Sequence, residues 1–292
     1  MLKGSIVALV TPFKASGEIN EERLRFLINW HIKNKTDAIL VCGTTGESAT
    51  LSHAEHRRVI DIAVEETKKR IPVIAGAGSN CTEESTDLAV HAQKVGADAV
   101  LVITPYYNKP MQEGMYRHFR AVAEAAKIPV IMYNVPSRTG VNLLPETAAR
   151  VYNDQKNVIG VKEASGNMDQ IVQLMSLVDR KFLLFSGSDE INLPILAMGG
   201  VGAISVAANV IPKPMHDMVE SYLKGNLEKS RKLQLDYYKL IKALFIETNP
   251  IPTKTALGLM RLIEPHLRMP LSAMGESNVL KLKAVMEKYG LL

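Results

Sequence analysis

Short runs of apolar, often β-branched residues alternate along the chain with longer amphipathic stretches. There are eight such runs, at residues 5–10, 38–42, 73–75, 99–103, 130–133, 158–161, 182–185 and 202–206. They lack the polar alternation of a strand with one solvated face, which is typical of parallel strands buried on both faces. Most intervals leave room for one helix and two loops. The pattern therefore predicts an α/β fold, specifically a closed (β/α)8 TIM barrel.

The stretches between the apolar runs contain signals for helix ends. Ser52, with Glu55 three residues later, forms a capping box in front of a helix over 55–69. Gly96 is placed to end the next helix. Pro145 suits the first position of another, where its missing N–H costs nothing.

The chain continues well beyond the last apolar run. Residues 226–245, 253–262 and 276–289 read as amphipathic helices. This is more than the final barrel helix requires. We therefore expect a barrel over 1–225 and a C-terminal α-helical extension over 226–292.

A doubly wound open sheet is the alternative architecture. It would need a glycine-rich turn that binds a nucleotide. Residues 76–81, GAGSNC, follow an apolar run but lack the third glycine of that motif.

Composition narrows the classes of function. The chain has 292 residues, 47% of them hydrophobic, and a formal net charge of +5. Its charges are interspersed and no basic arm carries aromatic residues, so we expect no nucleic-acid partner. No apolar stretch reaches the length of a membrane span, so we expect no membrane association and a soluble, cytoplasmic protein. Cys42 and Cys81 lack metal or disulfide-framework spacing and are predicted to be free, buried thiols.

Lys162 is the most unusual candidate for chemistry. It directly continues the apolar run 158–161, and period-two alternation would place it on one face with Val158 and Gly160. In a barrel, the carboxyl ends of the strands form the active-site face. A lysine in apolar surroundings is more easily neutral, and a neutral amine can attack a ketone to form an imine. The alternative is an ion pair with Glu163 at a solvated strand end.

Other strand ends offer supporting groups. Tyr133 ends the neighbouring run and could exchange protons with a Schiff base, or could be an ordinary core tyrosine. Residues 43–46, GTTG, supply hydroxyls and backbone N–H groups suited to a carboxylate, or form a plain turn. Arg138 could bind a second carboxylate or lie on a solvated surface.

A catalytic metal is not expected. His53 and His56 are spaced by three and flank Glu55, which does not match the HExxH pattern of a zinc site. The sequence also lacks a GxSxG motif of serine hydrolases.

Four motifs together resemble a known family. They are GTTGESATL at 43–51, TPYYN at 104–108, YNVPSRTG at 133–140 and GVKEA at 160–164. The chain is similar to the dihydrodipicolinate synthase family, also called 4-hydroxy-tetrahydrodipicolinate synthase, from residue 4 to residue 292. This family belongs to the pyruvate-dependent class I aldolases, with N-acetylneuraminate lyase.

The resemblance implies a reaction that needs no cofactor. Pyruvate would form an imine with Lys162 that tautomerises to an enamine. The enamine would attack L-aspartate 4-semialdehyde, and cyclisation would give 4-hydroxy-tetrahydrodipicolinate, in the first committed step of diaminopimelate and lysine synthesis.

The resemblance also assigns roles by position. Tyr133 would be the proton donor and acceptor, completed as a relay by Thr44 and by Tyr107 from a neighbouring subunit. The remaining substrate contacts would be Thr45 and the Ile204 backbone for the pyruvate carboxylate, Gly187 lining the pyruvate pocket and Arg138 for the semialdehyde carboxylate. A homo-oligomer is expected, as a tetramer built from two tight dimers.

Feedback inhibition by L-lysine is a further implication of the resemblance. The family's lysine cleft lies at the dimer interface, and Glu84 would supply the negative charge for the ligand's cationic groups. The cleft positions here are Ser48, Ala49, His53, His56, Asn80, Glu84 and Tyr106.

Two alternatives remain at this point. A sister aldolase, such as N-acetylneuraminate lyase or a 2-keto-3-deoxy-sugar-acid aldolase, would keep Lys162, Tyr133 and the GTTG turn but bind a polyhydroxylated partner. A binding protein without turnover would keep the cleft but lose part of the reactive set.

Overall fold

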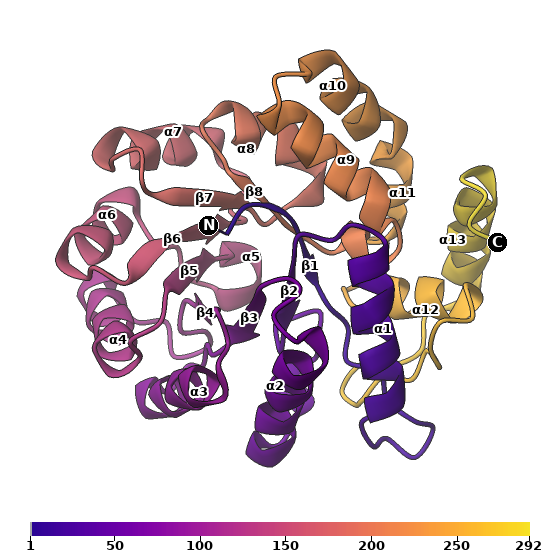
Figure 1. The fold of residues 1–292 in the computed structure, drawn as a ribbon, viewed down its shortest axis with the longest axis horizontal. Coiled ribbons are helices and arrows are strands. Elements are labelled where there is room, and N and C mark those ends of the chain that lie inside the picture. Colours follow the sequence, from indigo (N-terminus) through magenta and orange to yellow (C-terminus); the bar gives the residue numbers. More distant parts are fainter. Residues whose placement is uncertain (1) are drawn as a thin grey trace.

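The strands form a closed barrel. The computed structural model describes residues 2–292, and within them eight strands pair in the order β1 to β8, with β8 pairing back to β1. Every pairing in the barrel is parallel. Helices surround the strands, as Figure 1 shows. The predicted (β/α)8 barrel is confirmed, and the open doubly wound sheet is excluded because its two edges would be unpaired.

Strand bounds differ from the predicted apolar runs by two residues at most. The strands are β1 Gly4–Ala8, β2 Ala38–Val41, β3 Val73–Gly76, β4 Ala99–Ile103, β5 Val130–Asn134, β6 Val158–Glu163, β7 Leu183–Ser186 and β8 Gly202–Ser205. The longest of them, β6, therefore includes Lys162 and Glu163 instead of ending before them.

The helices lie between and after the strands. The barrel helices are α1 Glu21–Lys33, α2 His53–Thr67, α3 Thr82–Val95, α4 Gln112–Ala125, α5 Pro136–Thr139, α6 Pro145–Asp154, α7 Met168–Leu177, α8 Asn192–Ala197 and α9 Pro212–Leu223. The C-terminal helices are α10 Leu227–Asp236, α11 Tyr238–Ala243, α12 Ile251–Leu259 and α13 Glu276–Lys288. Short 3-10 turns, η1 Ser48–Thr50, η2 Asp189–Ile191 and η3 Ala207–Asn209, follow β2, β7 and β8.

The predicted helix ends are largely confirmed. Ser52 and Glu55 form a reciprocal capping box, so α2 begins at His53. Gly96 ends α3 in the left-handed region, with φ of 91°. Pro145 opens α6. Cys42 is buried as expected, but Cys81 is exposed because it is the N-cap residue of α3.

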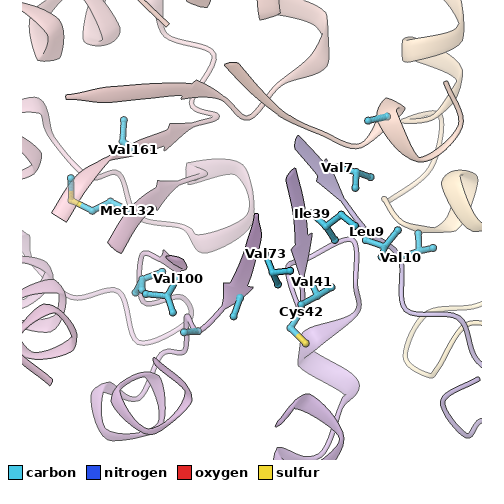
Figure 2. Close-up of a cluster of buried hydrophobic side chains, with 14 of the residues drawn as sticks. Val7, Leu9, Val10, Ile39, Val41, Cys42, Val73, Val100, Met132 and Val161 are labelled. Carbon is cyan, nitrogen blue, oxygen red and sulfur yellow. The ribbon is translucent and has the colours of Figure 1, made fainter. Parts of the chain in front are cut away.

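Apolar side chains form two layers, one on each side of the strands. The inner layer fills the barrel lumen and includes Ile6, Leu40, Ile131 and Phe185. The outer layer packs between strands and helices, and Figure 2 shows part of it, with Val7, Ile39, Val73, Val100 and Met132 among the labelled side chains. Burial on both faces explains why the strands lack polar alternation.

The predicted alternation along β6 is wrong at one residue. Val130 pairs with Val158, whereas the next residue, Ile131, pairs with Gly160, so the register shifts by one residue at Ile159. Val158 therefore packs in the outer layer. Lys162 lines the cavity in the barrel mouth instead. A bulge of this kind reverses the face on which the preceding side chains lie.

The C-terminal extension consists of four helices in place of the three predicted. The stretch predicted as one helix over 226–245 is split at Tyr237 into α10 and α11. In Figure 1, α12 and α13 lie to one side of the barrel. The boundary near residue 225 between barrel and extension stays a prediction. Across residues 2–292, none of the helices has both the length and the apolar character that a membrane crossing requires.

Candidate active site

A cavity of about 550 Å³ opens at the carboxyl ends of the strands. Residues at or just after all eight of these ends line it, among them Ala8, Gly76, Ile103, Tyr133 and Lys162. The C-terminal extension closes one wall with Phe245, Thr248, Asn249 and Pro250. The cavity is large enough for two small organic acids and is located where barrels carry their active sites.

Lys162 is buried in this cavity with an exposed fraction of 5%. Its Nζ lies 4.3 Å from the centroid of the Tyr133 ring. Burial lowers the pKa of Lys162 to about 8; Asp189 acts in the opposite direction and the Arg138 charge adds to the lowering. The amine is therefore much more often neutral near pH 7 than an ordinary lysine, which a nucleophile requires.

The alternative ion pair between Lys162 and Glu163 is wrong. Glu163 is itself buried, and its carboxylate accepts hydrogen bonds from Asn134 Nδ2 at 3.1 Å and from the Ser165 backbone N at 2.6 Å. Burial raises the pKa of Glu163. The two neighbours on β6 thus have separate surroundings.

Tyr133 pairs directly with Lys162 across β5 and β6. Burial raises the pKa of its phenol to about 12, while the charge of Arg138 and the hydroxyl of Thr44 act in the opposite direction. Tyr133 consequently stays protonated at neutral pH and can donate a proton to a group bound at Lys162.

The turn after β2 brings both threonines to the cavity. Gly46 N donates to Gly43 O at 3.1 Å and Glu47 N donates to Thr44 O at 3.1 Å, which closes the turn. Thr44 and Thr45 line the cavity. The Thr45 side chain accepts a hydrogen bond from Asn249 Nδ2 at 2.9 Å.

Arg138 lies on the short helix α5 and lines the cavity at its mouth. Its Nη2 donates to the backbone O of Asn249 at 3.1 Å. The guanidinium therefore has one contact that fixes its position and further N–H groups that can reach a ligand.

Gly187 leaves the space that the Lys162 side chain occupies. A Cβ at position 187 would lie 2.8 Å from Ala164 Cβ and 3.1 Å from Lys162 Cε. The side chain of Ile204, by contrast, belongs to the apolar layer in the barrel lumen, and the residue is only 1% exposed. Ile204 is not among the residues that line the cavity.

Tyr107 lies outside the cavity. Its side chain is 88% exposed and its backbone is left-handed, with φ of 72°. Within one chain it is thus not part of the cavity that Tyr133 and Thr44 line, although the family resemblance groups the three residues.

Of the seven positions predicted for a lysine cleft, three line the main cavity and four are not part of its lining. Ser48, Ala49 and Tyr106 line the main cavity itself. His53 Nε2 lies 3.0 Å from Glu84 Oε1, and the Glu84 charge raises the pKa of Tyr106 in addition to burial.

The other two cleft positions, Asn80 and His56, both have hydrogen-bond contacts within the chain. The Asn80 backbone O accepts from Asn108 Nδ2 at 2.8 Å. His56 is buried, with its Nε2 2.7 Å from Gly76 O, and burial lowers its pKa. His56 is thus already engaged with the barrel.

Sequence reasoning missed two residues that support the site. Asn249 contacts Thr45 and Arg138, and Lys254 forms a buried ion pair with Glu47, which follows the threonine turn. Both belong to the extension and contact residues more than 200 positions earlier. No local motif marks them, although Lys254 within the apolar stretch 251–259 is an unusual charge.

Fold and site together define a class, a parallel α/β barrel with a lysine and a tyrosine buried side by side in its mouth. The model of the dihydrodipicolinate synthetase family matches residues 1–289. The chain belongs to this family, and the predictions of family and of an enzyme are confirmed.

Related sequences agree over the full length. The 4-hydroxy-tetrahydrodipicolinate synthase of Geobacter sp. (strain M21) is 51% identical over 292 residues, covering 100% of each chain. The enzyme of the same name from Sulfurihydrogenibium sp. (strain YO3AOP1) is 53% identical over 293 residues, again covering 100% of each.

Solved structures agree as well. Dihydrodipicolinate synthase from Aquifex aeolicus has a TM-score of 0.98 at 46% identity, covering 99% of each chain. The Acinetobacter baumannii enzyme complexed with pyruvate has a TM-score of 0.97 at 40% identity, covering 100% of each. The Cyanidioschyzon merolae enzyme with lysine bound has a TM-score of 0.96 at 40% identity, covering 99% of each.

Proposed function

We propose that this chain condenses pyruvate with L-aspartate 4-semialdehyde to give 4-hydroxy-tetrahydrodipicolinate, the first committed step toward diaminopimelate and lysine. The observation that carries the proposal is Lys162, buried 4.3 Å from the ring centre of Tyr133 in a cavity of about 550 Å³. Relatives at about half identity are named 4-hydroxy-tetrahydrodipicolinate synthase, and a 40% identical dihydrodipicolinate synthase was solved in complex with pyruvate; both support the choice of substrates.

The first step is attack of the neutral Lys162 amine on the keto carbon of pyruvate. With a pKa of about 8, roughly one amine in ten is neutral at pH 7. The protonated phenol of Tyr133 donates a proton to the hydroxyl that leaves as water, which yields the imine. Loss of a methyl proton then gives the enamine, whose carbon attacks the aldehyde of the second substrate.

The two carboxylates are bound at separate places. The Thr44–Thr45 turn, which lines the cavity, binds the carboxylate of pyruvate, and Gly187 leaves room beside Lys162. The Ile204 backbone is included as a further contact on the family resemblance alone, since Ile204 is not part of the cavity lining. Arg138, at the mouth, binds the carboxylate of the semialdehyde. Transfer of the imine to the substrate's own amino group and ring closure release the product and free Lys162.

Tyr107 completes the proton relay from a second subunit. An 88% exposed tyrosine in a left-handed backbone conformation is suited to reach across to a partner rather than into its own barrel. The active form is then at least a dimer, and we propose a tetramer built from two such dimers.

L-lysine is the proposed feedback inhibitor. Glu84, 3.0 Å from His53 and electrostatically coupled to Tyr106, provides the negative charge that the cationic groups of lysine require. Ser48 and Ala49 line the reaction cavity, which supports a lysine cleft adjoining it. Millimolar lysine is expected to inhibit the native enzyme and to lose most of its effect on Glu84→Gln; unchanged kinetics of the native enzyme at that concentration reject the inhibition.

Trapping of the imine tests the central step. The protein is incubated with pyruvate and borohydride, and the modified peptide is mapped by mass spectrometry. We expect a single adduct on Lys162, none in Lys162→Ala, and an unchanged adduct in the control Lys181→Ala, which removes a surface lysine. An adduct elsewhere overturns the assignment of the nucleophile.

The second substrate is tested separately. A coupled assay compares aspartate semialdehyde with N-acetylneuraminate and a 2-keto-3-deoxy sugar acid. Turnover of the semialdehyde alone is expected. Cleavage of the sugar acids in its place would assign the chain to a sister aldolase, and pyruvate trapping without any turnover would indicate a binding protein.

A further inference from the structure

The C-terminal extension contributes a wall of the cavity at residues 248–250. Asn249 is the polar residue of this wall that contacts the β2 turn, and it is only 4% exposed. A buried amide needs partners for its N–H groups and for its oxygen. Where those partners lie determines what Asn249 does.

Both ends of the Asn249 side chain are engaged. Nδ2 donates to Thr45 Oγ1 at 2.9 Å, and Oδ1 accepts from Thr253 Oγ1 at 3.2 Å. Thr253 is fully buried one helical turn further along α12. The amide is thereby held with its N–H group toward Thr45 and its oxygen toward Thr253.

This contact sets the direction of the Thr45 hydroxyl proton. A threonine hydroxyl has one proton to donate and two lone pairs that accept. Because Thr45 Oγ1 accepts from Asn249, its own proton is free to point elsewhere, and Thr45 lines the cavity. A carboxylate is bound only by donors, so the hydroxyl is presented in the orientation that the pyruvate carboxylate requires.

The turn and the extension are joined at a second point. Two residues beyond Thr45, Glu47 pairs with Lys254 of α12, with both side chains almost fully buried. The Asn249 backbone O also accepts from Arg138 Nη2 at 3.1 Å. The segment around Asn249 is therefore fixed relative to both groups that are proposed to bind carboxylates.

We propose that Asn249 is a positioning residue that directs the Thr45 hydroxyl toward the carboxylate of the bound 2-oxo acid. The inference rests on the proposed function, since it takes pyruvate as the ligand. It acts through the side-chain amide, whereas Arg138 is held by the backbone of the same residue. Changing the side chain should therefore affect pyruvate and spare the semialdehyde.

Asn249→Asp is the sharpest test because it keeps the shape and removes the donor. At neutral pH or above, the new carboxylate accepts the Thr45 proton and turns it away from the cavity. We expect the KM for pyruvate to rise roughly tenfold or more, the range for losing one hydrogen bond to a charged group. The KM for the semialdehyde and kcat at saturating pyruvate should each change less than about threefold, while an unchanged pyruvate KM overturns the proposal.

A double-mutant cycle with Thr45→Val separates positioning from general damage. If Asn249 acts through the Thr45 hydroxyl, Asn249→Asp adds little to the pyruvate KM once that hydroxyl is gone. Independent, additive effects on the pyruvate KM would overturn the proposal. If Asn249→Asp does not fold, Thr253→Val is used instead, because it removes the hydroxyl that holds the Asn249 amide oxygen. Thr253→Val is expected to raise the pyruvate KM severalfold. An unchanged pyruvate KM in this variant also overturns the proposal.

Borohydride trapping keeps this inference distinct from the proposed function. The native enzyme is titrated with pyruvate and the adduct on Lys162 is quantified. An adduct in the native enzyme with the same concentration dependence in Asn249→Asp refutes the positioning role alone. Absence of an adduct in the native enzyme refutes the proposed function instead.

Discussion

Replacing Lys254 by methionine tests how the extension stabilises the site. The Nζ of Lys254 lies 2.5 Å from Glu47 Oε1 and 2.8 Å from His266 O, and the two side chains of the ion pair are 0% and 1% exposed. Glu47 Oε2 also accepts from Arg268 N at 3.1 Å. Lys254→Met keeps most of the apolar stem but leaves the Glu47 carboxylate buried without its cation.

The expected loss is large for one substitution. Removing one partner of a buried ion pair costs about 3–5 kcal/mol, because the remaining charge has lost its solvation and gains nothing in return. For a chain of this size, each kcal/mol lowers the melting temperature by about 2–4 °C. Lys254→Met should therefore melt roughly 6–20 °C below the native protein.

Thermal unfolding, followed by circular dichroism at one protein concentration, measures the loss. Lys232→Met is the matched control, since Lys232 pairs with Asp236 in the same extension but is 73% exposed. The control should lose less than about 1 kcal/mol. The double variant Glu47→Gln/Lys254→Met should recover part of the stability by removing the unpaired charge. If Lys254→Met has the same melting temperature as Lys232→Met, the buried ion pair does not stabilise the packing of the extension on the barrel.

Three further results are expected. The rate of imine trapping by pyruvate should rise with pH and level off above about 8, because the pKa of Lys162 is lowered to about 8; a midpoint near that of a free lysine would contradict the burial argument. Arg138→Ala should reduce kcat/KM for the semialdehyde by roughly 10–100-fold while pyruvate trapping stays nearly unchanged, and equal damage to both would mean that Arg138 is structural. Burial lowers the pKa of His31 to about 3, so the unfolded state binds the extra proton and stability is lost as pH falls from about 6.5 toward 3. The native protein should lose free energy of unfolding, measured in urea, between about pH 6.5 and pH 5, and His31→Leu should make this loss smaller by about 2 kcal/mol. An unaltered pH dependence of the unfolding free energy would show that His31 does not contribute to the loss.

Local pattern in the sequence was sufficient for the barrel and for the choice of Lys162 as a candidate for chemistry. Unbroken apolar runs such as 99–103 must be covered on both faces, which a parallel barrel achieves, and the observed β4 has the same bounds. The capping box at Ser52 and Glu55 acts over three residues and could therefore be predicted. Lys162 was conspicuous because a charge that continues an apolar run must be desolvated.

Only the tertiary structure decided the features that depend on distant partners. The register shift at Ile159 follows from how β6 pairs with β5, so the face of Val158 could not be derived from alternation along β6 alone. Asn249 and Lys254 meet Thr45 and Glu47 across more than 200 residues. A short-range pattern records which side chains share one strand or helix, whereas a buried amide or ion pair is defined by the partner that compensates its desolvation, and folding alone brings that partner into place.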